Sequence, residues 1–238
     1  MVSYGIDFGP TNTAVIECLF TGHGMSTTKY GENEQPFPSL VALHEEKPPL
    51  FGMEVKRRRS QLKADGYIVI SSFKSILGTN QSISVGTKRY TSIGVTALFF
   101  EYIKASVEQR SGSVMSDAVI AIPVDFTPEQ RDALRRAATQ AGINVRYLVS
   151  EPSAAYIYSK EEIKGASNVA VFDWGGGTLD VSIISADGGN IHELAVAGKR
   201  LGGNDIDEMI ARHLHARIMQ ESGIPKAFAD MSGAERDQ

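Results

Sequence analysis

Three consecutive glycines between two aspartates, in the run Asp173–Asp180 (DWGGGTLD), constrain this chain more than any other feature. Hydrophobic segments at 168–172 and 179–184 flank the glycines, which predicts a β-hairpin with acids at its mouth. Glycine lacks a Cβ atom, so its backbone N–H groups can approach a ligand closely, and successive N–H groups can bind phosphate oxygens. The flanking carboxylates could then hold a hydrated divalent cation on that phosphate. The alternative is an ordinary hairpin, since hairpin loops commonly contain glycine and aspartate.

A similar arrangement lies near the N-terminus. Residues 4–9 read as a strand that ends in a turn at Pro10, and residues 13–20 return as a second strand. Asp7 and Gly9 lie at the mouth of this predicted hairpin. Two acid–glycine hairpins, one early and one late, indicate an internally duplicated architecture.

The composition excludes several classes of partner. With 238 residues, 42% hydrophobic and 22% charged, the chain has the composition of a globular protein with one large or two small domains. Its net charge of −4 gives no electrostatic basis for binding nucleic acid or an anionic membrane. We find no signal peptide and no apolar run of the roughly 18 residues that a membrane span needs, so we expect a cytoplasmic protein. The single cysteine, Cys18, lies in an apolar strand pattern and is expected to be buried and unreactive.

Strand and helix patterns alternate in the middle of the chain, which predicts an α/β fold with a partly parallel sheet. The expected elements are a helix from Ser92, a strand at 118–122 that is buried on both faces, a helix from Thr127 to Gly142, a strand at 145–149 and a helix opened by Glu151. The helix at Thr127 has the clearest signal, because Thr127 and Gln130 match a capping box and Pro128 suits the first turn.

Residues 31–90 are less regular and contain four prolines, which predicts an irregular inserted region. Within it we expect a short helix over Glu54–Asp65, on which Arg57–Arg59 forms a solvated charged face. The following turn, Ser72–Gly78, carries one lysine, Lys74.

The C-terminal part predicts a strand at 191–197 and a helix after Gly202–Asp205 that ends at Gly223–Pro225. Its apolar residues share one face, as in a core-facing helix: Ile206, Met209, Ile210, Leu214 and Ile218. The capping-box sequence Ser232–Glu235 predicts another helix three residues before the end. We therefore expect the chain to be truncated from a longer protein.

Acids at strand ends and helix mouths indicate a magnesium and phosphate site. Asp7, Glu151, Asp173 and Asp180 occupy such positions, where ligands of α/β sheets bind. Phosphoryl transfer to water needs phosphate binding, charge neutralisation and an oriented water, which the glycine run, Lys74 and a carboxylate could supply. The five histidines form no zinc-like cluster, and no serine lies in a nucleophile elbow. The glycines fit neither the dinucleotide fingerprint nor the P-loop spacing.

Five segments, in order, resemble motifs of the 70-kDa heat-shock chaperone family: residues 5–13, 118–143, 150–155, 172–183 and 200–207. The resemblance implies an actin-like ATPase fold, α/β, with duplicated ribonuclease-H-like mixed sheets. Residues 1–165 would form the first lobe, with an irregular inserted subdomain at about 31–90. Residues 166–238 would begin a second lobe that is incomplete.

The resemblance also implies a role for each matched residue. The implied catalytic residues are Lys74, Glu151 and Asp173. The implied phosphate contacts are Asp7, Gly9, Thr11, Asn12, Gly175, Gly176, Gly177, Thr178, Gly202 and Gly203. Asp7, Glu151 and Asp173 would hold Mg²⁺, mostly through water, and Asp180 with Thr178 would help bind K⁺. Pro123 and Arg131 match positions that couple nucleotide state to peptide binding. The implied ligands are ATP and ADP, with unfolded polypeptides and co-chaperones as partners of the full-length protein.

Two departures from the family pattern stand out. Pro10 replaces a threonine, which removes a hydroxyl and an N–H from the first phosphate loop; we expect slower hydrolysis or weaker sensing of the γ-phosphate. The chain also ends before the family's adenosine motif and peptide-binding domain, so we expect weak nucleotide affinity.

Three other functions compete with a chaperone ATPase. An actin-like filament protein shares the acid–glycine hairpins, although the segment 120–131 favours the chaperone. A nucleotide-sensing module with little turnover is suggested by Pro10. A sugar kinase is the least favoured, because no sugar-binding segment is evident.

Overall fold

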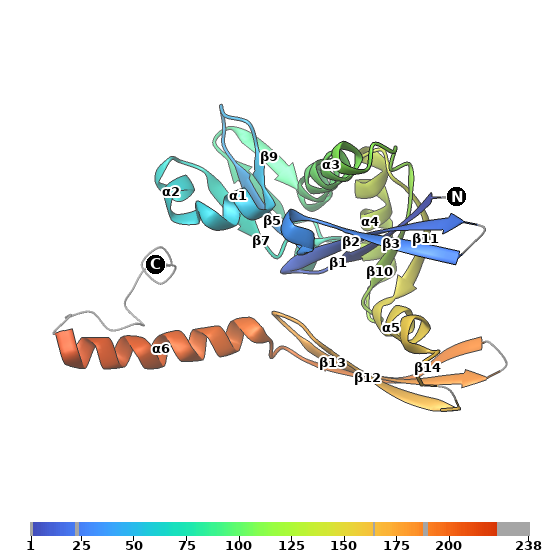
Figure 1. Cartoon of the computed structure of the whole chain (residues 1–238). Coiled ribbons are helices and arrows are strands. Elements are labelled where there is room, and N and C mark those ends of the chain that lie inside the picture. The colour runs from blue at the N-terminus through green and yellow to red at the C-terminus, as the bar shows by residue number, and fades with distance from the viewer. Residues whose placement is uncertain (1, 22–23, 164, 188–189, 223–238) are drawn as a thin grey trace.

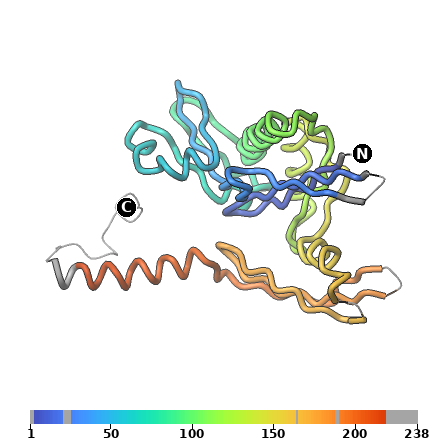
Figure 2. The backbone as a smooth tube through the Cα atoms, in the orientation of Figure 1, coloured from blue at the N-terminus to red at the C-terminus, as the bar shows by residue number. Residues whose placement is uncertain are grey.

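The computed structural model describes residues 2–21, 24–163, 165–187 and 190–222, which form a mixed α/β protein (Figures 1 and 2). The helix expected at Ser232–Glu235 and the helix end expected at Gly223–Pro225 lie outside these residues. No helix built from the described residues is both long and apolar enough to cross a membrane.

A six-stranded N-terminal sheet lies at the centre of the larger part of the molecule. Its strands are β1 (Val2–Phe8), β2 (Asn12–Thr21), β3 (Gly24–Tyr30), β4 (Phe37–Pro38), β10 (Asp117–Ile122) and β11 (Asn144–Ser150). Their order is β11-β10-β1-β2-β3, with β4 paired to β2. Strand β10 runs parallel to both β1 and β11, while the remaining pairs are antiparallel. The expected partly parallel sheet is confirmed.

Helices α3 (Ser92–Ser111) and α4 (Pro128–Gln140) pack against each other over one face of this sheet (Figure 1). Beneath them the rings of Phe8 and Phe100 meet edge to face with centroids 5.1 Å apart, and both side chains are fully buried. The predicted capping box begins α4, because Thr127 and Gln130 each accept a hydrogen bond from the other's backbone N–H. The sequence signal therefore placed this helix correctly.

Two burial predictions need correction. In β10 the residues Ala118, Ile120 and Ile122 are buried, but those between them are only half-buried, so the strand is not enclosed equally on both faces. Cys18 is half-buried rather than buried. Partial burial still raises the pKa of its thiol, which favours the unreactive protonated form.

The region between β3 and α3 forms two small sheets with short helices. Its elements are η1 (Glu32–Glu34), β5 (Leu40–Leu43), β6 (Leu50–Phe51), α1 (Gly52–Arg57), α2 (Arg59–Ala64), β7 (Ile68–Ser71), η2 (Phe73–Ile76), β8 (Ser82–Val85) and β9 (Lys88–Thr91). The single helix predicted over Glu54–Asp65 is two helices that meet at Arg58, whose backbone leaves the helical conformation. Val55, Leu62 and Tyr67 contribute to a small separate core that holds this region together.

The C-terminal part is a three-stranded antiparallel sheet followed by one long helix. Strands β12 (Asn168–Trp174), β13 (Leu179–Asp187) and β14 (Asn190–Lys199) lead into α6 (Gly203–Ser222). Helix α5 (Glu151–Ser159) lies between the two sheets and packs against strands of both (Figure 1).

The apolar stripe of α6 does not face a core in this structure, contrary to the helical pattern. Its members are 40% to 68% exposed: Ile206, Met209, Ile210, Leu214 and Ile218. Figure 2 shows α6 running away from the N-terminal sheet, so that sheet does not cover the stripe.

Candidate functional site

Three predicted catalytic or metal-shell residues come from elements that are distant in sequence. Lys74 lies in η2, Glu151 is the first residue of α5, and Asp7 lies near the end of β1. The Nζ atom of Lys74 donates a hydrogen bond to Oε1 of Glu151 at 3.0 Å. The site is therefore assembled by the tertiary fold and not by a local motif.

Lys74 is held in a nearly enclosed environment. The residue is only 6% exposed, and its Nζ atom lies 5.7 Å from the ring centroids of both Phe8 and Phe126. A cation over aromatic faces gains electrostatic attraction while the rings exclude water. The geometry fixes the position of the ammonium group beside Glu151.

The pKa values of the carboxyl groups show that four charges share one neighbourhood. Loss of water raises the pKa of Glu151 above its usual range, Lys74 opposes this rise, and Asp7 and Asp173 add to it. Partial desolvation likewise raises the pKa of Asp7, although its side chain retains contact with solvent, and Lys74 again opposes the shift. Asp173 repels Asp7 as well. The structure thus brings together Asp7, Lys74, Glu151 and Asp173.

The donor set is suited to a hydrated cation and not to a tightly chelated one. Within the described residues, no group of three or more histidine, cysteine or acidic side chains is close enough to hold a metal directly. Magnesium usually keeps several waters and takes only one or two carboxylates from the protein. The carboxylates of Asp7, Glu151 and Asp173 would bind such a cation through its water shell.

The glycine run forms the predicted hairpin, and its mouth meets that of the first hairpin. Strands β12 and β13 pair with Asp173 opposite Asp180, and Gly175 N–H donates to the Thr178 carbonyl at 2.9 Å. A Cβ atom on Gly176 would lie 2.6 Å from Oγ1 of Thr11. Glycine is therefore required at this approach between the two turns.

The beginning of α6 docks on the same glycines. Gly203 N–H donates to the Gly175 carbonyl at 3.0 Å, and Asn204 N–H donates to the Gly176 carbonyl at 2.8 Å. A Cβ atom on Gly202 would overlap the Gly176 carbonyl group. Gly202 N–H is also occupied, because it donates to Oδ2 of Asp205 at 2.7 Å. The N–H groups of Gly202 and Gly203 therefore already have acceptors.

The N–H groups at the tip of the hairpin are different. Among the described residues, neither Gly176 N–H nor Gly177 N–H has a hydrogen-bond acceptor. Free backbone donors beside Thr11 are the type of group that binds a phosphate oxygen.

The first turn, Gly9 to Asn12, is held by a residue that the sequence did not single out. Gly9 N–H donates to the Asn12 carbonyl at 3.1 Å, which closes the turn. Ser39 donates its hydroxyl to the Gly9 carbonyl at 2.8 Å and its N–H to the Thr11 carbonyl at 2.8 Å. No local pattern marks Ser39, because its partners lie about 30 positions away.

Asp180 lies opposite Asp173 in the β12–β13 pair, but its carboxylate is engaged on the β14 side. It pairs with Gly198 across β13 and β14, and its carboxylate lies against the Gly198 α-carbon, where a side chain would overlap it. Asp180 is not among the charges that shift the pKa of Asp7 or Glu151.

Pro123 and Arg131 flank the turn that carries Phe126. The Pro123 carbonyl accepts from Phe126 N–H at 3.3 Å, and Arg131 Nε donates to the Phe126 carbonyl at 2.8 Å. Because the Phe126 ring covers Lys74, this turn is in contact with the buried ion pair.

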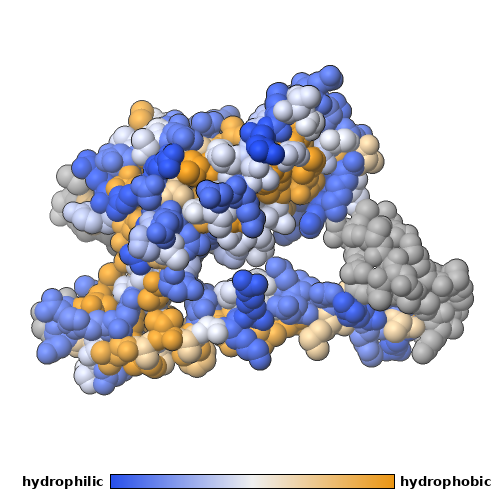
Figure 3. Space-filling view, turned by 180° about the vertical axis from the view of Figure 1, so that it is seen from behind, coloured by the Kyte–Doolittle hydropathy of each residue, from blue (hydrophilic) through white to orange (hydrophobic). Residues whose placement is uncertain are grey.

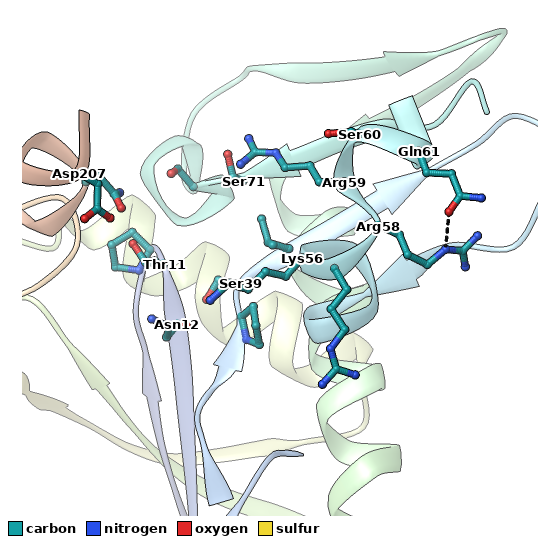
Figure 4. Close-up of a pocket in the computed structure, with 16 residues that line it drawn as sticks. Thr11, Asn12, Ser39, Lys56, Arg58, Arg59, Ser60, Gln61, Ser71 and Asp207 are labelled. Carbon is teal, nitrogen blue, oxygen red and sulfur yellow. Dashed lines mark hydrogen bonds between the residues drawn. The ribbon is translucent and has the colours of Figure 1, made fainter. Parts of the chain in front are cut away.

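A cleft of about 860 Å³ opens beside the first turn (Figure 4). It is lined by Pro10, Thr11 and Asn12, by residues 56–61 of α1 and α2, and by Asn204 and Asp207 of α6. Sequence reasoning missed the lining residues of α1 and α2 and treated Arg57–Arg59 only as a solvated face. Of these three arginines only Arg57 is exposed, whereas Arg58 and Arg59 are half-buried, so the solvated face is confirmed only in part. Arg57 pairs with Glu32, and Arg58 pairs with Glu54.

Comparison with known families agrees with the geometry. The chain matches the family model described as Hsp70 protein over residues 78–232, which is about two thirds of its length. The match includes Glu151, Asp173 and the glycine run, and it reaches past the N-terminus of α6. The chain thus carries sequence of the Hsp70 nucleotide-binding domain, and it belongs to the Hsp70 family.

Proposed function

We propose that this protein binds ATP with its phosphates at the point where the two hairpins meet. The Lys74–Glu151 ion pair, with the carboxyls of Asp7 and Asp173 beside it, is the observation that carries this proposal. The tip of the glycine hairpin supplies free N–H groups of Gly176 and Gly177 next to that cluster. Oriented donors and balanced charges are what phosphoryl transfer requires of a protein.

The proposed binding roles follow the two hairpins. Gly9, Thr11 and Asn12 contact phosphate from the first turn, and Gly175 to Thr178 contact it from the second. Gly9 and Gly175, like Gly202 and Gly203, contribute close backbone approach, since their N–H groups already have acceptors. The site lies between two lobes of a duplicated actin-like fold, residues 1–165 and 166–238.

Asp7, Glu151 and Asp173 hold the water shell of Mg²⁺ in this proposal. When bound, the cation neutralises charge on the phosphates. Asp180 and Thr178 contribute to a K⁺ site.

The proposed reaction is hydrolysis of the γ-phosphate. A water oxygen forms a bond to the γ-phosphorus, the bond to the β–γ bridging oxygen breaks, and that oxygen leaves on ADP. Lys74 positions the water and the γ-phosphate, and Asp173 accepts the proton that the water loses. Water held between a fixed ammonium and a carboxylate is already oriented for attack, which lowers the entropic part of the barrier.

The proposed output is a change in peptide binding elsewhere in the protein. Pro123 and Arg131 hold the turn whose Phe126 ring covers Lys74, so they are placed to sense the cluster. Unfolded polypeptides and co-chaperones are the proposed partners, and the cytoplasm is the proposed location.

Variants of Lys74 and Asp173 test this function. We expect Mg·ATP to bind the wild-type protein in calorimetry and to release phosphate in a single turnover. Lys74→Ala and Asp173→Asn should each slow release by about 100-fold or more, because each removes a group that acts on the reacting atoms. Lys63→Ala, in α2, is the control and should retain the wild-type rate. Failure of the wild-type protein to bind Mg·ATP would contradict the proposal.

A second candidate, a nucleotide sensor with little turnover, is favoured by Pro10, which faces the cleft and has no N–H to offer a phosphate. It predicts Mg·ATP binding without measurable phosphate release, and the same single-turnover experiment separates the two functions.

A further inference from the structure

One carboxylate of the C-terminal sheet accepts hydrogen bonds from two serines, one before and one after Glu151 in the sequence. Glu193, in β14, accepts a hydrogen bond from the Ser153 hydroxyl at 2.8 Å and another from the Ser150 hydroxyl. Ser150 is the N-cap of α5, and its oxygen also accepts from Ser153 N–H at 3.2 Å. Glu193 therefore holds the first turn of the helix that begins with Glu151.

A β-bulge turns Glu193 toward α5. In β14 the register shifts, so that Ala195 pairs with Ile183 but Glu193 pairs with Ile184, which leaves Leu194 as the extra residue. Without the shift, Leu194 would lie opposite Ile184 and Glu193 would point to the other face of the sheet. Bulges commonly re-aim a side chain in this way. Leu194 is left 60% exposed, whereas Ile184 is buried.

The hydrogen bonds of Glu193 to Ser150 and Ser153, called the tether below, connect the two halves of the proposed site. Helix α5 carries Glu151, which bonds to Lys74 on the N-terminal side. Strand β14 belongs to the sheet that carries Asp173, and it leads directly into Gly202, which packs on Gly176. A change in the angle between α5 and this sheet would therefore move Asp173 and the glycine tip relative to Lys74 and Glu151.

We propose that Glu193 is a positioning residue for phosphoryl transfer: through Ser150 and Ser153 it fixes α5 against the C-terminal sheet. The proposal rests on the proposed ATPase function. Hydrogen bonds from hydroxyls to a carboxylate are stronger than those between neutral groups, and a negative charge is favoured at a helix N-terminus. Both effects keep Glu193 on α5, although its side chain is exposed.

Two variants separate the hydrogen bonds from simple loss of a side chain. Glu193→Ala removes the acceptor, whereas Glu193→Gln keeps an oxygen that can accept from both serines. Glu208→Ala is the control, because Glu208 is also an exposed glutamate of the C-terminal part, and its hydrogen bonds to described residues stay within α6, to Arg212. Ser153→Ala deletes one of the two hydroxyls and leaves the Ser150 cap in place.

The first readout is the split between binding and chemistry. We expect Glu193→Ala to slow single-turnover phosphate release by about tenfold or more, since small misplacements of reacting groups are costly, with the Kd for Mg·ATP changed by less than about threefold. Glu208→Ala should stay close to wild type, whereas Ser153→Ala and Glu193→Gln, which keeps the acceptor oxygen but loses the charge, should lie between wild type and Glu193→Ala. An unchanged rate in Glu193→Ala, or a loss in Glu193→Gln as large as in Glu193→Ala, would overturn the proposal.

The second readout does not depend on activity. Spin labels at Gln140 in α4 and Asp187 in β13, in a Cys18→Ser background, report the distance between the two halves. Glu193→Ala should broaden or shift the distance distribution, and Glu193→Gln should do so less. A distribution unchanged by Glu193→Ala would overturn the tether itself. Absence of phosphate release from the wild-type protein would contradict the ATPase function, while the distance measurement would still decide on the tether.

Discussion

At the scale of single residues, the proposed site depends on one ion pair, Lys74 with Glu151, that is largely shielded from water. Lys74 is charged, nearly enclosed and bonded to Glu151, with Phe8 and Phe126 beside it. Removing one member of an enclosed ion pair leaves the other charge without compensation, which costs more than the pair contributes. The pair thus keeps an ammonium group in a place where a lone lysine would be unfavourable.

Pro10 is the residue whose replacement should increase activity. It follows Gly9 in a turn closed by the Gly9–Asn12 hydrogen bond, where proline is well tolerated. Pro10→Thr restores a hydroxyl and an N–H, each able to form a bond to charged phosphate worth about 1.5–3 kcal/mol. We expect the single-turnover rate of phosphate release to rise by roughly tenfold or more. Pro49→Thr, at an exposed position, is the control, and an unchanged rate in Pro10→Thr would rule out this role.

Tyr30 should make stability sensitive to alkaline pH. Its ring is 3% exposed and its hydroxyl donates to Glu17 at 2.5 Å; burial and the Glu17 carboxylate raise its pKa to about 12. The neutral phenol is favoured in the folded state, so its stabilisation is complete below pH 10 and is lost as pH rises from about 10 to 12. Two pKa units correspond to about 3 kcal/mol as an upper limit.

Urea unfolding as a function of pH tests this expectation. Tyr30→Phe should flatten the decline in the free energy of unfolding between pH 10 and 12. Tyr158→Phe, at a position that is 88% exposed, should keep the wild-type profile. If the free energy of unfolding of Tyr30→Phe declines between pH 10 and 12 as steeply as that of the wild type, a group other than Tyr30 causes the decline.

At the scale of elements, features encoded by neighbouring residues can be predicted from the sequence, whereas contacts between distant segments cannot. The capping box of α4 and the hairpin at 173–180 are encoded within a few neighbouring residues, and both were predicted from the sequence. The hold of Ser39 on the first turn joins segments about 30 positions apart. The contact of Glu193 with α5 depends on a bulge in β14, and the neighbouring sequence contains no pattern that predicts this bulge. Both therefore required the folded structure.

The docking of α6 on the glycine hairpin should not tolerate a side chain at Gly202. A Cβ atom there would overlap the backbone of Gly176, whereas a Cβ on Gly177 meets nothing within 4 Å. Gly202→Ala should push α6 away and weaken the hydrogen bonds of Gly203 and Asn204, at a cost of about 1–3 kcal/mol. Hydrogen exchange of those two amides should accelerate in Gly202→Ala and remain near wild type in Gly177→Ala. Equal exchange in the two variants would contradict this packing.

At the scale of the whole molecule, the two parts differ in how completely they bury their apolar residues. The N-terminal sheet encloses a continuous core under α3 and α4. In the C-terminal sheet, Phe172 is 71% exposed and Trp174 is 60% exposed, and apolar surface is visible over this part in Figure 3. Exposed apolar surface of this kind is where proteins associate with other surfaces.

Trp174 reports on this face, because it is the only tryptophan of the chain. We expect emission typical of a solvent-exposed indole and efficient quenching by acrylamide. Phe99→Trp in a Trp174→Phe background is the buried reference, since Phe99 is fully buried. Shielded, blue-shifted emission from Trp174 would mean that the face is covered in solution.

Because the two hairpin turns contact each other, nucleotide binding and the association of the two halves of the molecule should depend on each other. Thr11 and Gly176 lie in turns that connect strands of separate sheets, so the proposed phosphate site exists only while the two halves are joined. A ligand that touches both halves strengthens their association by mass action. Bound ATP would then stabilise the association of the two halves. Its hydrolysis would change that stabilisation, so the reaction would alter the contact between halves on which nucleotide binding itself depends.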